Sequence, residues 1–372
     1  MAFNKLLKIH RTMKLKYLTS SILIFIIISC HKDKAKESRE YNAGNPLFQF
    51  EGRTEQLNDS AVALISSGSF AQMKVVGDTC IFFISNGNQD HSYVTLEVNQ
   101  EYKGRFLVDE NPIGLKLSSS DTSNIKIYKA TEASTGDVIF NKIIAENLLE
   151  VETERKPLIE FIGNSITCGM GSHTEEIPCD KGEWYDQHNA YLAYGPRAAR
   201  ALNTDFRLSC VSGMGMYRNW NDEDQAVMPD VYENLRLNTD SSKKVTIDRM
   251  PDLVSIALGT NDLSVGDGQK ERSEFNQEKF VANYIGFVEK VFQKFPETKI
   301  TLLTSPMIGE KEQVILLESL QKVKNHFSEK PLFIFEFDIM KPNGCGGHPD
   351  IEDHKKMTEH LIPFLEKILN SN

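Results

Sequence analysis

After Pro157 the chain alternates short apolar runs with longer segments of helical periodicity, and this alternation is the strongest constraint on its fold. In the segment 276–295, for example, Phe280, Tyr284 and Val288 recur on one helical stripe. The predicted strands are 158–162, 206–210, 253–258, 300–304 and 332–337, and the predicted helices include 188–202, 276–295 and 350–369. Strands that alternate with helices form a parallel sheet with helices on both faces. We therefore predict an α/β fold, a three-layer α/β/α domain around a parallel sheet of about five strands.

The first part of the chain has a different pattern, in which strand-like runs are separated by turn signals such as Asn111-Pro112. These runs are 69–76, 79–85, 93–98, 105–108 and 125–128. Strands at this spacing predict a β-sandwich with a jelly-roll-like arrangement. The segment 150–156 is mostly charged and is followed by Pro157, so we place a boundary there. The predicted domains are 42–150 and 157–372.

Length and charge limit the classes of protein to which this chain can belong. The 372 residues fit about two domains. Residues 1–29 hold five basic and no acidic side chains, and without them 37 basic and 52 acidic residues leave a formal charge of −15. An acidic surface repels phosphate backbones, so we expect no nucleic-acid partner. The charge is compatible with a neutral substrate such as a polysaccharide.

The N-terminal segment has the features of an export signal. Residues 21–29 form an uncharged apolar run that is too short to span a bilayer, which needs about 20 residues. Basic residues precede the run, and Cys30 follows it as in a bacterial lipobox. We predict a lipoprotein signal over 1–30, a lipid anchor on Cys30 and a polar tether over 31–41. Within the signal, either Met13 is the true start or the first twelve residues are irrelevant. The protein would be exported and held at the cell surface or the periplasmic side of a membrane by this anchor alone. The alternative is a cleaved signal without a lipid.

Five cysteines follow the signal segment, and this odd number leaves at least one thiol free. Export permits disulfides, and Cys168 and Cys179 are one candidate pair across a loop, but the sequence leaves the pairing open. The cysteine spacing does not resemble a zinc site, so no metal is expected.

Four residues whose groups suit catalysis follow predicted strands. Ser165 comes after Gly163, Gly213 lies in a turn, Asn261 precedes an aspartate, and His348 ends a glycine-rich loop. Ligands of parallel sheets bind beyond the carboxyl ends of the strands, so these residues are expected to meet. Each has an ordinary alternative explanation, as a helix cap, a glycine turn, an Asx-turn or an exposed histidine. Together they supply a nucleophile, two donors for an oxyanion and a base.

This order of residues resembles the four sequence blocks of the SGNH (GDSL-like) hydrolases, over roughly residue 157 to the end. The most telling segments are 259–262 and 347–349. The resemblance implies that Ser165 is the nucleophile and His348 the base. It also implies an oxyanion hole formed by the N–H groups of Ser165 and Gly213 and the side chain of Asn261. No organic cofactor is implied.

A closer resemblance is to carbohydrate esterase family 2, in which a jelly-roll-like domain precedes the SGNH domain. Segments 50–53, 191–195, 250–253 and 344–345 carry it. It implies removal of acetyl groups from glycan hydroxyls, as in acetyl xylan and glucomannan esterases. Two alternatives remain, another SGNH lipase or thioesterase and an inactive glycan-binding lipoprotein. The polar loops 171–187 and 218–230 favour a sugar over an apolar acyl chain.

The sequence departs from the family pattern at two positions. Asn164 stands where the family usually has aspartate, and Cys345 stands three residues before His348, where many members have the third residue of a triad. We therefore expect a Ser-His dyad in which a backbone carbonyl orients the imidazole. Asp350 is the rival orienter, although it could equally cap the last helix.

Side chains outside the four blocks carry weaker expectations. Trp220 is predicted to stack on a pyranose ring, the alternative being a packing role between loops. His173, His188 and His354 are expected at the surface. The first domain is expected to shape the cleft or to cover a face of the second, rather than to bind glycan itself.

Overall fold

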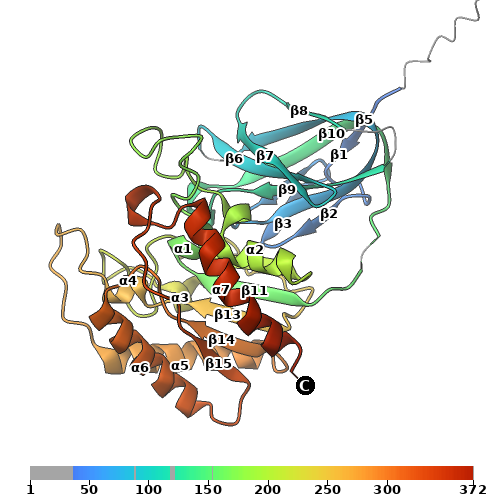
Figure 1. Cartoon of the computed structure of the whole chain (residues 1–372). Helices are drawn as coiled ribbons and strands as arrows, with labels where there is room; N and C mark the ends of the chain where they lie inside the picture. Colours follow the sequence, from blue (N-terminus) through green and yellow to red (C-terminus); the bar gives the residue numbers. More distant parts are fainter. Residues whose placement is uncertain (1–36, 88, 118–121, 153, 372) are drawn as a thin grey trace, which may run out of the picture. The chain divides into compact units, whose positions relative to one another are not determined.

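The first sheet, at the top of Figure 1, is built from ten antiparallel strands of the described chain. The computed structural model describes residues 37–87, 89–117, 122–152 and 154–371, so the predicted signal, Cys30 and most of the predicted tether lie outside the described residues. The strand order is β3-β4-β10-β5-β9-β6-β7, with β1 beside β10 and with β2 and β8 beside β5. The strands are β1 (Arg39–Asn42), β2 (Gln49–Glu51), β3 (Thr54–Asn58), β4 (Ala61–Leu64), β5 (Phe70–Asn86), β6 (Ser92–Val98), β7 (Glu101–Val108), β8 (Ile113–Lys116), β9 (Thr122–Lys129) and β10 (Val138–Leu149).

Strand β5 makes this sheet sandwich-like, because its two halves have different neighbours. Its first half pairs with β2 and β9, and its second half pairs with β8. The change occurs at Gly77, whose φ of +120° lets the strand bend. The runs 69–76 and 79–85 are therefore one bent strand and not two. Strand β1 already begins at Arg39, inside the segment predicted as a tether, because it pairs with β10.

The second sheet confirms the predicted α/β architecture. Its five strands are all parallel and follow the order β12-β11-β13-β14-β15. They are β11 (Leu158–Gly163), β12 (Asp205–Cys210), β13 (Leu253–Ala257), β14 (Lys299–Leu303) and β15 (Leu332–Phe335). The described helices are α1 (Ser165–Cys168), α2 (Tyr194–Ala201), α3 (Met228–Val231), α4 (Thr260–Leu263), α5 (Gln277–Lys294), α6 (Glu310–His326) and α7 (Ile351–Leu369), and the 3-10 turns are η1 (Ala133–Thr135), η2 (Ala190–Leu192) and η3 (Cys345–Gly347). None of these helices is long and apolar enough to cross a membrane.

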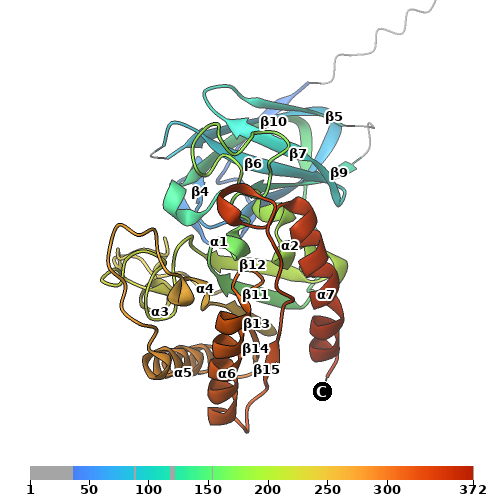
Figure 2. The same ribbon diagram turned by 60° about the vertical axis from the view of Figure 1, so that its left-hand side comes forward.

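Helices cover both faces of the parallel sheet, as Figures 1 and 2 show. Side chains alternate along a strand, so Ile159 and Phe161 of β11 face one layer, with α2 and α7. Val254 and Ile256 of β13 face the other layer, with α5 and α6. The predicted helix over 188–202 is shorter than expected, because the 3-10 turn η2 precedes α2.

The two sheets share buried side chains. Phe70 and Tyr128 of the first sheet pack in the same core as α2 and α7. Arg53, in the bend between β2 and β3, is fully buried and donates to the carbonyls of Tyr232 at 2.7 Å and Asn234 at 2.8 Å. A buried guanidinium needs such partners, so the two parts of the chain are fixed against each other.

Candidate active site

The order of strands in the parallel sheet determines where a site can form. The chain direction across the sheet reverses between β11 and β13. In parallel sheets, ligands bind at the carboxyl ends of the strands at such a reversal. Ser165 begins the helix that follows β11, Gly213 follows β12, and Asn261 lies in α4 after β13. His348 approaches from the loop before α7. The fold thus gathers the four predicted residues at one edge.

Ser165 and His348 form a hydrogen-bonded pair. The Ser165 Oγ lies 2.8 Å from His348 Nε2. Ser165 is the first residue of α1, and Asn164 caps this helix by accepting from the Ile166 N–H at 3.1 Å. Asn164 is therefore the helix cap at the position where SGNH hydrolases usually have aspartate. The pair has the geometry required of a nucleophile and its base.

The other nitrogen of the imidazole contacts the backbone. His348 Nδ1 lies 3.1 Å from the Gly346 carbonyl, which fixes a tautomer with the proton on Nδ1 and leaves Nε2 free to accept the serine proton. Burial lowers the pKa of His348 below its ordinary value, although the bond to Gly346 opposes this shift. The histidine is therefore neutral at neutral pH, as a general base must be.

Asp350 does not orient the imidazole in this structure. It is the N-cap of α7, and its carboxylate accepts from the Asp353 N–H at 2.8 Å. Asp353 returns the contact at the Asp350 N–H, which completes a capping box. The rival explanation of Asp350 as a helix cap is thus the one that the structure supports.

Gly213 and Asn261 are the two further residues predicted to form an oxyanion hole. Gly213 has a φ of +79°, and a Cβ added to it would lie 2.6 Å from Trp220 Cδ1, so only glycine fits this turn. The Asn261 Nδ2 donates to the Met214 carbonyl at 2.7 Å, which orients the carboxamide and leaves its second N–H for another acceptor.

Asp262 supports the same loop, a role that the sequence did not suggest. Its buried carboxylate accepts from the backbone N–H groups of Met216, Tyr217 and Arg218 at 2.8 to 3.2 Å. Burial raises the pKa of Asp262 to about 6, against the opposing effect of these hydrogen bonds. The only sequence signal was its position directly after Asn261.

The disulfides differ from the candidate pairing. Cys168 bonds to Cys210, and Cys179 bonds to Cys345, while Cys80 is buried and free. The suggested Cys168–Cys179 pair was wrong because β11 and β12 are neighbours, so the turn after β11 meets the end of β12.

The expected surface histidines are buried instead. His354 lies on the inner face of α7 and stacks on Tyr194 with ring centroids 6.3 Å apart. His173 Nδ1 lies 3.1 Å from the Asn189 amide, and His188 is enclosed beside Glu132. These side chains pack between segments that are distant in the sequence, so the sequence alone did not indicate their burial.

Trp220 has the packing role considered for it, and its stacking on a sugar stays a prediction. One side of the ring packs against Gly213, and the backbone N–H of Trp220 donates to the Gly213 carbonyl at 2.9 Å. The side chain is nevertheless 39% exposed. It therefore offers a flat apolar surface next to the predicted oxyanion turn.

Comparison with known proteins supports the predicted class of GDSL-like hydrolases. Residues 161–325 match the model of the GDSL-like Lipase/Acylhydrolase family. An acetylxylan esterase / glucomannan deacetylase from Cellvibrio japonicus is 23% identical over 359 residues, which span 93% of this chain and 96% of the relative.

Solved structures show the same fold. A family two carbohydrate esterase from Cellvibrio japonicus matches with a TM-score of 0.77 and 21% identity, over 90% of this chain and 98% of its own. One from Clostridium thermocellum, in complex with cellohexaose, matches with a TM-score of 0.75 and 23% identity, over 87% of this chain and 99% of its own.

Proposed function

We propose that this chain, whose residues 161–325 belong to the GDSL-like lipase/acylhydrolase family, is a serine esterase that removes O-acetyl groups from polysaccharide or oligosaccharide hydroxyls. The observation that carries the proposal is the 2.8 Å contact between Ser165 Oγ and His348 Nε2 at the carboxyl edge of the parallel sheet. A serine esterase works through such a pair and a nearby oxyanion hole, and this mechanism requires no cofactor.

The first half of the reaction forms an acetyl-enzyme. Ser165 Oγ attacks the acetyl carbonyl carbon as His348 Nε2 accepts the hydroxyl proton. The carbonyl oxygen becomes an oxyanion, which receives hydrogen bonds from the N–H groups of Ser165 and Gly213 and from Asn261. The tetrahedral intermediate collapses with cleavage of the bond to the sugar oxygen, and His348 returns the proton to this oxygen.

The second half releases acetate. A water molecule attacks the acetyl carbon, and His348 accepts a proton from it. The same three donors stabilise the second oxyanion. When the bond to Ser165 breaks, the histidine reprotonates Ser165 Oγ, and the site returns to its starting state. The Gly346 carbonyl holds the imidazole throughout, in the place of a triad carboxylate.

Two observations support an acetylated glycan as the substrate. The relative from Cellvibrio japonicus is named an acetylxylan esterase / glucomannan deacetylase. In this chain the partly exposed Trp220 stands beside Gly213, where a pyranose ring could stack while its acetyl group reaches Ser165. A sugar leaving group suits such a surface better than a long acyl chain does.

We also propose that the protein is exported and anchored through a lipid on Cys30, on the sequence pattern of residues 21–30. Two disulfides in the described chain support an oxidising compartment. Metabolic labelling with a radioactive fatty acid tests the anchor. Wild-type protein should take up the label and sediment with membranes, and Cys30→Ala should do neither. Equal labelling of both proteins would contradict it.

The deciding experiment measures acetate release from an aryl acetate, acetylated xylan and acetylated glucomannan. Wild type should release acetate, and Ser165→Ala should lose nearly all of this activity while keeping its melting temperature. Ser172→Ala is the matched control, because within the described part of the chain its hydroxyl bonds only to the Gly169 carbonyl, at 2.9 Å. Release by Ser165→Ala at the wild-type rate would refute the mechanism. No release by either protein, together with retained glycan binding, would favour a binding lipoprotein.

A further inference from the structure

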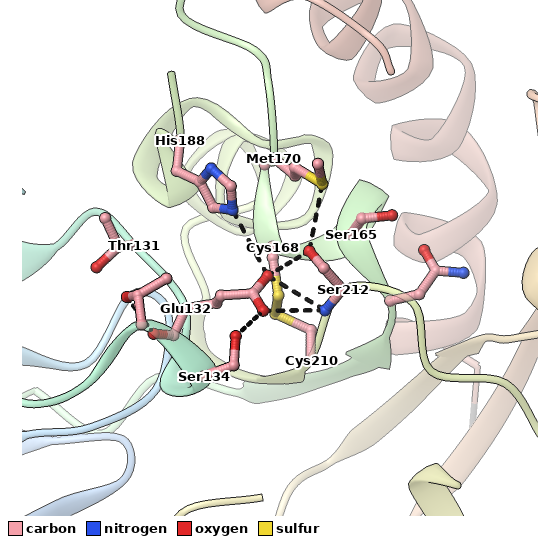
Figure 3. Close-up of polar contacts among 12 residues, drawn as sticks. Thr131, Glu132, Ser134, Ser165, Cys168, Met170, His188, Cys210 and Ser212 are labelled. Carbon is pink, nitrogen blue, oxygen red and sulfur yellow. Dashed lines mark hydrogen bonds and ion pairs between the residues drawn. A yellow bond between two sulfur atoms is a disulfide. The ribbon is translucent and has the colours of Figure 1, made fainter. Parts of the chain in front are cut away.

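Glu132 is a fully buried carboxylate that the mechanism above does not use. It follows β9 and precedes the 3-10 turn η1, so it belongs to the part of the chain that carries the first sheet. Its side chain nevertheless extends to the turn after β12, as Figure 3 shows, where it contacts Ser212 and His188. A buried charge at this place requires an explanation.

The carboxylate is bound mainly by Ser212. Its two oxygens accept from the Ser212 N–H at 3.1 and 3.2 Å, and Oε2 also accepts from the Ser212 hydroxyl. The Ser134 hydroxyl donates to Oε1, and His188 Nε2 lies 3.5 Å from Oε2. Burial alone would raise the pKa of Glu132, but the contacts with His188, Ser134 and Ser212 together hold it below its ordinary value. The group is therefore an ionised acceptor.

The backbone of Glu132 is also fixed from the first sheet. Lys129 is fully buried, and its Nζ donates to the Glu132 carbonyl at 2.6 Å and to the Ile65 carbonyl at 2.7 Å. The Thr135 hydroxyl donates to the same Glu132 carbonyl at 2.8 Å. The carboxylate thus extends from a rigid base, and it can hold another segment in place.

The segment that it holds contains a predicted oxyanion donor. Ser212 directly precedes Gly213, and on the other side Cys210 is joined by a disulfide to Cys168, at the end of the helix that Ser165 begins. The turn is therefore fixed at one end by the disulfide and at the middle by Glu132. Donors to an oxyanion must be placed accurately, since a shift of about 1 Å can reduce a rate about 100-fold.

We propose that Glu132 is a positioning residue of the active site, which fixes the Ser212–Gly213 turn so that the Gly213 N–H faces the oxyanion. The part of the chain with the first sheet thereby completes the catalytic centre rather than only covering it. This inference rests on the proposed serine esterase mechanism. It does not depend on which ester is the substrate.

Glu132→Gln tests the role, because it keeps the shape of the side chain but replaces one acceptor oxygen with an amide donor. With an aryl acetate, kcat should fall about 10- to 100-fold while KM changes less than about threefold. Glu97→Gln is the matched control. Glu97 is also a buried carboxylate of the first sheet. It accepts a hydrogen bond from the Tyr191 hydroxyl, in the second part of the chain, at 2.8 Å. This control should lose stability without losing kcat.

A fluorophosphonate probe provides a readout that is independent of the substrate, because it reacts with an activated serine whatever ester the protein cleaves. Its labelling rate at Ser165 should fall in Glu132→Gln and not in Glu97→Gln. Labelling of wild type without any acetate release would refute the acetyl substrate but still test Glu132. An unchanged labelling rate in Glu132→Gln would overturn the positioning role, even if the esterase proposal holds.

Ser212→Ala guards against a variant that fails to fold, since it removes only a hydroxyl and keeps the N–H contact with Glu132. The labelling rate should fall several-fold, by less than in Glu132→Gln. If Glu132 acts through Ser212, the double variant should lose less than the product of the two single losses. Multiplied losses in the double variant would show that Glu132 does not work through this turn.

Discussion

Cys345 stands three residues before His348 and is joined by a disulfide to Cys179, with the two Cα atoms 5.1 Å apart. The Cys345 N–H also donates to the Gly171 carbonyl at 2.9 Å. The loop that carries the base is thus tied to the loop 171–187 at the position where many SGNH enzymes have an aspartate. Gly346, whose carbonyl orients the imidazole, directly follows this tie.

Removing the tie should therefore impair catalysis as well as stability. The double variant Cys179→Ala/Cys345→Ala should lose about 3–5 kcal/mol of stability. At a temperature where it is still folded, its kcat should fall about 10-fold because the imidazole is less well oriented. Cys80→Ala is the control, since this buried cysteine is free. A wild-type kcat in the folded double variant would show that the glycine-rich loop holds its shape unaided.

The acid limb of the pH profile should reflect His348. Burial lowers the pKa of His348, and only the neutral imidazole can accept the proton of Ser165. Hence kcat/KM should be constant near neutral pH and should fall only as pH drops through a midpoint below 6.5. The buried Asp262 titrates in a similar pH range, since burial raises its pKa to about 6. NMR titration of the His348 ring separates the two groups, and a ring midpoint above 6.5 would contradict this prediction.

Asp350 should matter for stability and not for turnover, because it caps α7 and does not contact the imidazole. Asp350→Ala should cost about 1 kcal/mol in the free energy of unfolding and leave kcat nearly unchanged. Asp350→Asn is the matched control, since asparagine caps helices as well as aspartate does. A loss of kcat on the order of 10⁴-fold in either variant would show a triad instead of a dyad.

Trp220 should contribute to glycan binding more than to the chemical step. Trp220→Ala should raise KM for an acetylated oligosaccharide about 10-fold, because a stacking surface is lost. An aryl acetate should be affected much less. Trp220→Phe keeps a flat ring against Gly213 and should retain most of the affinity. Equal losses with both substrates in Trp220→Ala would indicate that the ring only supports the turn.

Much of the architecture was predictable from the sequence because each buried strand is an apolar run that ends in a turn. The parallel sheet and its helical layers follow from this alternation, and the ligand edge of such a sheet explains why Ser165, Gly213, Asn261 and His348 converge. Local signals were enough to predict these four positions, since each residue is located by the strand or glycine-rich loop just before it in the sequence.

Features that depend on contacts between distant segments were not predictable in the same way. The disulfide partners are set by which loops meet, so spacing alone could not pair Cys179 with Cys345, 166 residues away. Glu132 lies 80 residues before Ser212, in a turn without any recognisable motif. The burial of His188 and His354 likewise results from the packing of remote elements, which a single sequence does not disclose.

The contribution of Asn261 to the oxyanion hole can be measured directly. Its amide donates one hydrogen to the Met214 carbonyl, so the other is held in a fixed direction. Asn261→Ala should reduce kcat about 10²–10³-fold with little change in KM, because the hydrogen bond strengthens only as the oxyanion forms. Asn261→Asp should be at least as impaired, since a carboxylate would repel the oxyanion. A boronic acid inhibitor, which resembles the tetrahedral intermediate, should lose affinity in parallel with kcat/KM across these variants. If inhibitor affinity stayed constant while kcat fell, Asn261 would act on the shape of the loop and not on the oxyanion.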